Sequence, residues 1–161
     1  MKTRPVMPAD FADVLALNEE SVQYLSPLSL ARLSDLHRQS EFHRVVEAGS
    51  RVIAFILALR QGADYDSVNY RWFAQRYAEF LYIDRVVVSR DAHGNGAGSI
   101  LYRQLFDHAS RHRIPVVACE FDVAPLNPAS ERFHAKFGFV EVGRQSVAAG
   151  RKTVSLQTAV Q

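Results

Sequence analysis

Three glycines stand at alternate positions in the segment 90–101, RDAHGNGAGSIL, between a β-rich run and a helical pattern. Glycine adopts positive φ without strain and lets another atom approach where a Cβ would collide. At a junction from strand to helix, backbone N–H groups and the helix dipole favour an anion such as a phosphate. The segment therefore indicates a phosphate site, although a glycine-rich turn before a helix is also an ordinary connection.

The residue at position 99 excludes two common phosphate loops. A P-loop has lysine after its last glycine, and the dinucleotide fingerprint GxGxxG has glycine there, whereas this chain has Ser99. The three glycines have the spacing GxGxG, and this pattern alone does not identify the ligand.

A tyrosine and a carboxylate of the run FLYIDRVVVS are candidates for proton transfer. Strand alternation places Tyr82 and Asp84 on one face. A carboxylate facing an apolar cleft has a raised pKa, which suits a base near neutral pH, so Asp84 is the first candidate. The alternatives are that Asp84 pairs with Arg51 or with Arg85 of a second copy, or that it acts through ordered water.

The later run IPVVACEFDV carries two more carboxylates. Glu120 and Asp122 alternate onto one face, where one of them binds the positive charge of a substrate or both form structural ion pairs. Cys119 is predicted to be a buried packing residue and not a nucleophile. His108 and His112 are four residues apart on a predicted helix, but no third ligand is evident nearby, so we expect a solvated helix face and no metal.

Composition bounds the class of protein. A chain of 161 residues, 48% hydrophobic and 22% charged, suits the core of one domain, so we expect a single domain over 1–161. The net charge of +2 comes from scattered cations, which argues against a nucleic-acid partner. The chain shows no apolar signal region at its start and no apolar run of the roughly 20 residues that a membrane span requires. We expect a cytoplasmic protein that does not bind membranes.

Residue periodicity predicts an α/β fold with one mixed, mostly antiparallel sheet of about seven strands covered by helices. Strands are expected near residues 3–7, 42–49, 50–60, 80–89, 114–123, 139–147 and 152–160, and helices within 8–25, 26–40, 97–112 and 128–138. Between them, residues 61–79 form a long connection with five aromatics, which either line a substrate or pack the connection onto the sheet. Its acidic neighbours Asp64, Asp66 and Glu79 favour a small cationic substrate.

The segments VVVSRDAHGNGAGSILYRQL and FDVAPLNPASERFHAKFGFVEVG resemble the GNAT superfamily of acyl-CoA-dependent N-acyltransferases. The family has a loop R/Q-x-x-G-x-G/A before a helix, and later a motif V-x-x-x-N-x-x-A-x-x-F-Y-x-x-x-G-F. The second motif reads here Val123, Asn127, Ser130, Phe133, His134, Gly138 and Phe139. The resemblance covers residues 80–145 closely and the remainder only through the order of elements.

The resemblance implies acetyl-CoA as co-substrate, with its pyrophosphate in the glycine loop and its pantetheine arm between splayed central strands. The arm pairs with the main chain of Val86, Val87 and Val88, as an added strand would, and a backbone N–H near Val88 meets the oxyanion. The other implied cofactor-binding residues are His93, Gly94, Asn95, Gly96, Ala97, Gly98, Ser99, Asn127, Ser130 and His134.

Two positions depart from the family pattern. His93 replaces the usual Arg or Gln, and His134 replaces a Tyr that lies near the cofactor sulfur and is proposed to protonate the departing thiolate. Histidine can also donate a proton, with a pKa nearer neutrality. The alternative is that His134 only packs against the cofactor or the sheet.

The resemblance thus predicts an N-acetyltransferase that transfers an acetyl group to a primary amine by direct attack in a ternary complex, with Asp84, His134 and Tyr82 as catalytic residues. The acceptor is a small-molecule amine or a protein N-terminus, and the family suggests a homodimer. A catalytically silent acyl-CoA sensor is an alternative, because His134 replaces the tyrosine. A nucleotide-binding domain that prefers NAD or ATP is a third possibility.

Overall fold

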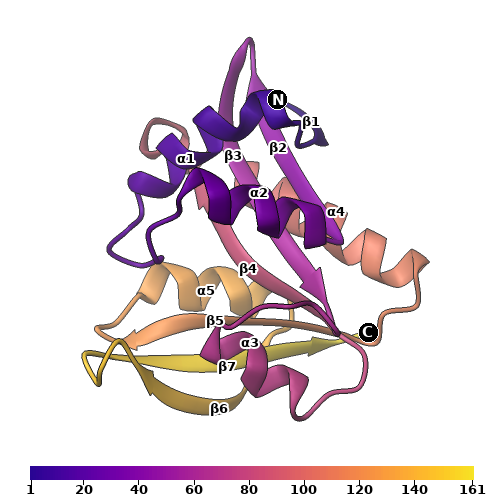
Figure 1. The fold of residues 1–161 in the computed structure, drawn as a ribbon, viewed down its shortest axis with the longest axis vertical. Coiled ribbons are helices and arrows are strands. Elements are labelled where there is room, and N and C mark those ends of the chain that lie inside the picture. The colour runs from indigo at the N-terminus through magenta and orange to yellow at the C-terminus, as the bar shows by residue number, and fades with distance from the viewer. The chain divides into compact units, whose positions relative to one another are not determined.

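The computed structural model describes residues 1–161 as an α/β chain (Figure 1). Its strands are β1 (Lys2–Pro5), β2 (Phe42–Ala48), β3 (Arg51–Arg60), β4 (Leu81–Val88), β5 (Val116–Ala124), β6 (Val140–Val147) and β7 (Lys152–Val160). Its helices are α1 (Phe11–Glu19), α2 (Leu30–Gln39), α3 (Val68–Ala74), α4 (Ala97–Arg111) and α5 (Pro128–Lys136), with short 3₁₀ turns η1 (Pro8–Asp10) and η2 (Arg90–Ala92). None of these helices combines the length and apolar character needed to cross a bilayer.

The strand order is β1-β2-β3-β4-β5-β7-β6, so the predicted sheet of about seven strands is confirmed. Strands β4 and β5 are parallel, with Leu81 opposite Val117 and Tyr82 opposite Ala118. The pairs β1–β2, β2–β3, β5–β7 and β6–β7 are antiparallel. A mixed, mostly antiparallel sheet is therefore what the chain forms.

The chain divides into two compact units. The first unit comprises Met1–Leu59 and Ile83–His108, and the second comprises Arg60–Tyr82 and Ala109–Gln161. Strand β4 passes from the second unit into the first between Tyr82 and Ile83. The expectation of a single domain stays a prediction.

The first unit is built around β3. Every residue from Val52 to Leu59 is buried, as expected of a strand covered on both faces. Helix α2 contributes Leu33 and Leu36 to this core, and the hydroxyl of Ser29 caps the helix by accepting a hydrogen bond from the N–H of Arg32. The apolar run at residues 52–59 thus forms the buried part of β3, the strand around which this unit is built.

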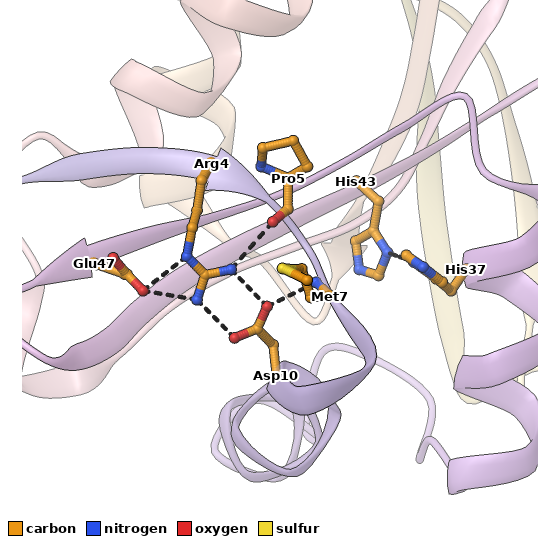
Figure 2. A network of polar contacts seen from close by, with 7 residues as sticks. All are labelled: Arg4, Pro5, Met7, Asp10, His37, His43 and Glu47. Carbon is orange, nitrogen blue, oxygen red and sulfur yellow. Dashed lines mark hydrogen bonds and ion pairs between the residues drawn. The ribbon is translucent and has the colours of Figure 1, made fainter.

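A polar network ties β1, β2 and the turn before α1 together in the first unit (Figure 2). The guanidinium of Arg4 donates to both carboxylate oxygens of Asp10 at 2.7 Å, and its Nε donates to Glu47 at 2.8 Å. Beside it, the Nδ1 atoms of His37 and His43 lie 2.9 Å apart, so one of them carries the shared hydrogen. The Nε2 of buried His43 has no hydrogen-bond partner.

In the second unit, α3 and α5 cover opposite faces of the strands (Figure 1). The Tyr82 hydroxyl donates to Glu120, so these residues share a face, and the Tyr70 ring of α3 packs on Tyr82 with centroids 5.5 Å apart. Phe121 alternates to the other face, where its ring lies 5.3 Å from that of His134 on α5.

The connection 61–79 contains a helix that residue periodicity did not predict. Helix α3 starts after Ser67, whose hydroxyl accepts a hydrogen bond from the N–H of Tyr70. Tyr65, Tyr70 and Phe73 are buried. For these three aromatics the packing interpretation is therefore correct, whereas Trp72 and Tyr77 stay partly exposed.

Candidate active site

The glycine loop joins β4 to α4 in the first unit and has the backbone form that its sequence predicts. Gly94 and Gly96 have φ values of 84° and 88°, a region that disfavours any residue with a Cβ. A Cβ at either position would meet nothing within 4 Å. The backbone conformation, and not close packing, therefore requires glycine here, and open space lies beside both residues.

The N-terminus of α4 begins in this loop. The side chain of Asn95 accepts a hydrogen bond from the N–H of Ala97, while Gly98 and Ser99 lie in the first helical turn, where N–H groups have no intrahelical partner. Such N–H groups, together with the helix dipole, suit a phosphate. The loop therefore has the backbone features of the phosphate site that its sequence indicates.

His93 closes the loop onto the end of β4. Its Nε2 lies 2.9 Å from the carbonyl oxygen of Val88, so the imidazole donates this hydrogen bond. Val86 and Val88 are half-buried and Val87 is buried. This hydrogen bond from the side chain of His93 thus ties the loop to the end of β4. The contact does not require the arginine or glutamine that the family usually has at this position.

Asp84 is paired inside its own chain. Its Oδ2 accepts a hydrogen bond at 2.8 Å from the Nε of Arg85, and both side chains are 4% exposed. Arg85 also donates to the side chain of Asn18 and to the carbonyl and hydroxyl of Ser26, which anchors the α1–α2 connection on β4. Sequence reasoning missed this role, because the pairing with Arg85 was expected only from a second copy.

The second unit holds two further carboxylates on one face of β5. Glu120 accepts a hydrogen bond from the hydroxyl of Tyr82. Asp122 is 7% exposed, and its Oδ2 accepts no hydrogen bond. The Nζ of Lys152 lies 3.5 Å from that oxygen. Burial raises the pKa of Asp122, and the nearby ammonium of Lys152 opposes this rise.

Helix α5 positions the residues of the second motif. Asn127 caps the helix, and its side chain accepts a hydrogen bond from the N–H of Ser130. The Nδ1 of His134 lies 2.7 Å from the carbonyl oxygen of Ser130, so this nitrogen carries the hydrogen. Burial lowers the pKa of His134. The imidazole is therefore neutral near pH 7, with the lone pair on Nε2.

Other candidates have structural roles. Burial raises the pKa of the Cys119 thiol well above its usual range, which agrees with its predicted packing role. The Nε2 of His108 donates a hydrogen bond to the carboxylate of Glu41 at 2.9 Å. The structure contains no group of three or more His, Cys, Asp or Glu side chains that could hold a metal ion.

Comparison with solved structures identifies the fold. The chain is similar to Ard1 from Thermoplasma volcanium, with 18% identity, a TM-score of 0.80, and coverage of 99% of this chain and 96% of that one. It is also similar to the ribosomal-protein-alanine N-acetyltransferase from Brucella melitensis, with 19% identity, a TM-score of 0.75 and full coverage of both chains. Naa50 from Arabidopsis thaliana, in complex with the bisubstrate analogue CoA-Ac-MVNAL, matches at 15% identity with a TM-score of 0.77, covering 99% of this chain and 98% of that one.

Sequence comparisons give the family. Comparison with curated proteins finds no match. The family model described as "Acetyltransferase (GNAT) family" matches residues 11–139, which include the glycine loop and the motif on α5. Because this match spans most of the chain, the protein belongs to the GNAT family of acetyltransferases, enzymes that use acetyl-CoA as acyl donor.

Proposed function

We propose that the protein transfers the acetyl group of acetyl-CoA to the N-terminal α-amine of a peptide or protein, by direct attack in a ternary complex. The pyrophosphate of the donor binds to the backbone of residues 94–99, and its pantetheine arm follows the main chain of Val86, Val87 and Val88. A backbone N–H near Val88 stabilises the oxyanion. Asn127 and Ser130 on α5 contact the donor, as the family motif suggests.

The observation that carries the proposal is the backbone of the glycine loop. Positive φ at Gly94 and Gly96 turns the chain so that residues 97–99 start a helix, and no protein atom fills the space beside either glycine. The same backbone form occurs in ordinary turns, as at Gly62, so what distinguishes this loop is its place directly before the first turn of the 15-residue helix α4, whose N–H groups suit a phosphate. Together with the family match, this geometry supports coenzyme A as the ligand.

Asp122 is the residue that best suits the removal of the amine proton. Among the carboxylates considered, Asp84 is held by Arg85, and Glu120 accepts the hydroxyl hydrogen of Tyr82. The buried Oδ2 of Asp122 accepts no hydrogen bond and has only the Lys152 ammonium at 3.5 Å as an ionic neighbour, and its raised pKa makes it a stronger base than an exposed carboxylate. In this proposal Asp84 and Tyr82, which the sequence suggested as catalytic, position neighbouring groups.

His134 has a role different from that of the tyrosine it replaces. With hydrogen on Nδ1 and a lone pair on Nε2, the neutral imidazole accepts a hydrogen bond and has no Nε2 proton to donate. We therefore assign His134 to binding the donor. The leaving thiolate takes its proton from water.

An α-amine suits this site better than a lysine side chain. An α-amino group has a pKa near 8 and a lysine a pKa near 10, so an α-amine is partly neutral at physiological pH and demands less of the base. Structural neighbours point the same way, since the Brucella melitensis enzyme is a ribosomal-protein-alanine N-acetyltransferase and the Naa50 complex holds a peptide analogue linked to CoA.

A thiol-release assay with matched acceptors tests the proposal. Peptides with free N-termini are compared with the same peptides carrying a blocked N-terminus and one internal lysine, and with polyamines. We expect CoA release with free N-termini and at least tenfold less with the other acceptors. Turnover only with polyamines or blocked peptides would contradict the acceptor class, and failure to bind acetyl-CoA would contradict the proposal as a whole.

A further inference from the structure

The turn η2, which leads directly into the glycine loop, is held by the C-terminal end of α1. The backbone N–H of Arg90 donates to Oε1 of Glu20 at 3.1 Å, and Nη2 of Arg90 donates to the carbonyl oxygen of Glu20 at 3.0 Å. Each side chain therefore bonds to the main chain of the other residue. Helix α1, η2 and the glycine loop all belong to the first unit.

These two hydrogen bonds cap two helical ends. Ser89 is the N-cap residue of η2 but provides no side-chain cap, and its hydroxyl accepts instead from Arg51 at 3.3 Å. The carboxylate of Glu20 takes the place of this cap, and its negative charge suits the N-terminal end of a helical turn. In return, Glu20 is the C-cap residue of α1, where the guanidinium of Arg90 supplies the cation that a C-terminal end favours.

The end of α1 is itself anchored in the interior of the first unit. Asn18 is 1% exposed, and its side chain accepts a hydrogen bond at 3.0 Å from Nη1 of Arg85 on β4. Arg85 is buried and paired with Asp84. Glu20 lies two residues beyond Asn18, and its N–H donates to the carbonyl oxygen of Leu17 at 3.1 Å. The carboxylate that caps η2 therefore comes from a well-anchored helix end.

We propose that Glu20 is a positioning residue for the donor: by capping η2 it holds residues 94–99 in the binding conformation before acetyl-CoA arrives. The inference rests on the proposed function, in which this loop binds the pyrophosphate of the donor. A loop that is already ordered loses less conformational entropy on binding, and the apparent affinity falls in proportion to the fraction of molecules in which the loop is ordered.

The charge of Glu20 separates positioning from direct electrostatics. A carboxylate near an anion site repels the anion, so removal of the charge alone would strengthen the binding of the donor. Loss of the cap predicts the opposite sign. Glu20→Ala removes the charge and the cap together, whereas Glu20→Gln removes the charge and keeps a side-chain oxygen that can accept the N–H of Arg90.

Titration calorimetry with acetyl-CoA and steady-state kinetics with an acceptor peptide test the inference. We expect the Kd and the KM for acetyl-CoA to rise about threefold to tenfold in Glu20→Ala, the effect of losing one solvent-exposed hydrogen bond. The kcat at saturating acetyl-CoA and the KM for the peptide should stay at the wild-type values, because the bound donor orders the loop in both proteins. Glu20→Gln should bind acetyl-CoA at least as tightly as the wild type. Glu19→Ala, at an exposed position of the same helix, is the matched control and should change none of these constants.

The outcomes separate the inference from the proposed function. An unchanged Kd in Glu20→Ala, in a protein whose wild type binds acetyl-CoA, would overturn the inference and leave the proposed function intact. Tighter binding by Glu20→Ala would show that the residue acts only through its charge, and a loss of kcat without a change in the KM for acetyl-CoA would show a role other than positioning the donor. Failure of the wild type to bind acetyl-CoA would instead overturn the proposed function, and the inference with it.

Hydrogen exchange of the wild type, followed by NMR, does not depend on whether a variant folds. If Glu20 orders η2 before the donor binds, the amide hydrogen of Arg90 is protected in the protein without acetyl-CoA, and addition of acetyl-CoA changes its exchange rate little. Exchange of this amide at the rate of an unstructured peptide, with protection only after acetyl-CoA is added, would overturn the inference.

Discussion

The indole of Trp72 on α3 lies directly over the α-carbon of Gly143 on β6. A Cβ at Gly143 would lie 2.5 Å from Cζ2 of Trp72, a distance that no real Cβ contact allows. The guanidinium of Arg76 lies 3.9 Å from the indole centroid, and Gln145 of β6 donates to the side chain of Asn69. The absence of a side chain at Gly143 therefore allows the indole of α3 to pack against β6.

Gly143→Ala should destabilise the protein because the new methyl group displaces the indole. Overpacking of this kind costs about 1–3 kcal/mol. In a Trp72→Ala background the same substitution should cost far less, since the ring that it displaces is absent. Urea unfolding of the four proteins of this double-mutant cycle measures the coupling, with exposed Ser146→Ala as the control. Additive effects would contradict the contact.

Acid should destabilise the protein through His43. Burial lowers the pKa of His43 to about 3, and the neighbouring His37 adds to this shift. The unfolded chain has a histidine pKa near 6.5 and binds the proton more readily, so stability is full above pH 6.5 and falls as the pH drops toward 3. At pH 5 the loss is about 2 kcal/mol. Thermal melts between pH 7.5 and 5 should show this slope in the wild type and a smaller one in His43→Asn.

The order of elements and the backbone form of the glycine loop could be predicted from sequence because both depend on local patterns. Alternating and helical periodicity gave the strands and most helices, and the glycines at 94 and 96 indicated positive φ at a strand-to-helix junction. Helix α3 was missed because the aromatics of residues 61–79 were interpreted as a loop. The cap residue Ser67 and the i,i+3 spacing of Tyr70 and Phe73 were the signals that identify it.

The surroundings of the candidate catalytic side chains were harder to predict because their partners are distant in sequence or depend on orientation. Alternation placed Asp84 on a strand face, but only the structure pairs it with Arg85 and connects that arginine to Asn18. Likewise, Asp122 and Lys152 are 30 positions apart and meet only because β5 pairs with β7. A single sequence contains no signal for either contact.

Cys119→Ala should leave turnover nearly unchanged. The thiol is buried, and its raised pKa keeps it protonated, so it is not a nucleophile. The loss of one buried sulfur should lower the free energy of unfolding by about 1 kcal/mol. Steady-state kinetics at a temperature well below the melting transition measure the first effect. A hundredfold loss of kcat would indicate covalent catalysis and contradict direct attack.

Asp122→Asn should lower kcat for acceptor peptides by about 10²–10⁴-fold near neutral pH, because the amine loses its base. The activity that remains should rise with pH up to the pKa of the amine, since a deprotonated amine no longer requires the carboxylate. Asp84→Asn should act mainly on stability, because it leaves the buried Arg85 without its charged partner. A larger loss of kcat in folded Asp84→Asn than in Asp122→Asn would reverse the assignment of the base.

The binding of acetyl-CoA to Gly96→Ala, measured by titration calorimetry, tests the central claim most directly. Gly96 and Gly62 have φ values of 88° and 84°, and a Cβ at either meets open space, so Gly62→Ala carries the same backbone strain in a turn outside the loop. We expect the Kd for acetyl-CoA to rise at least tenfold in Gly96→Ala and to stay at the wild-type value in Gly62→Ala. Equal affinities in all three proteins would show that the loop does not bind the donor.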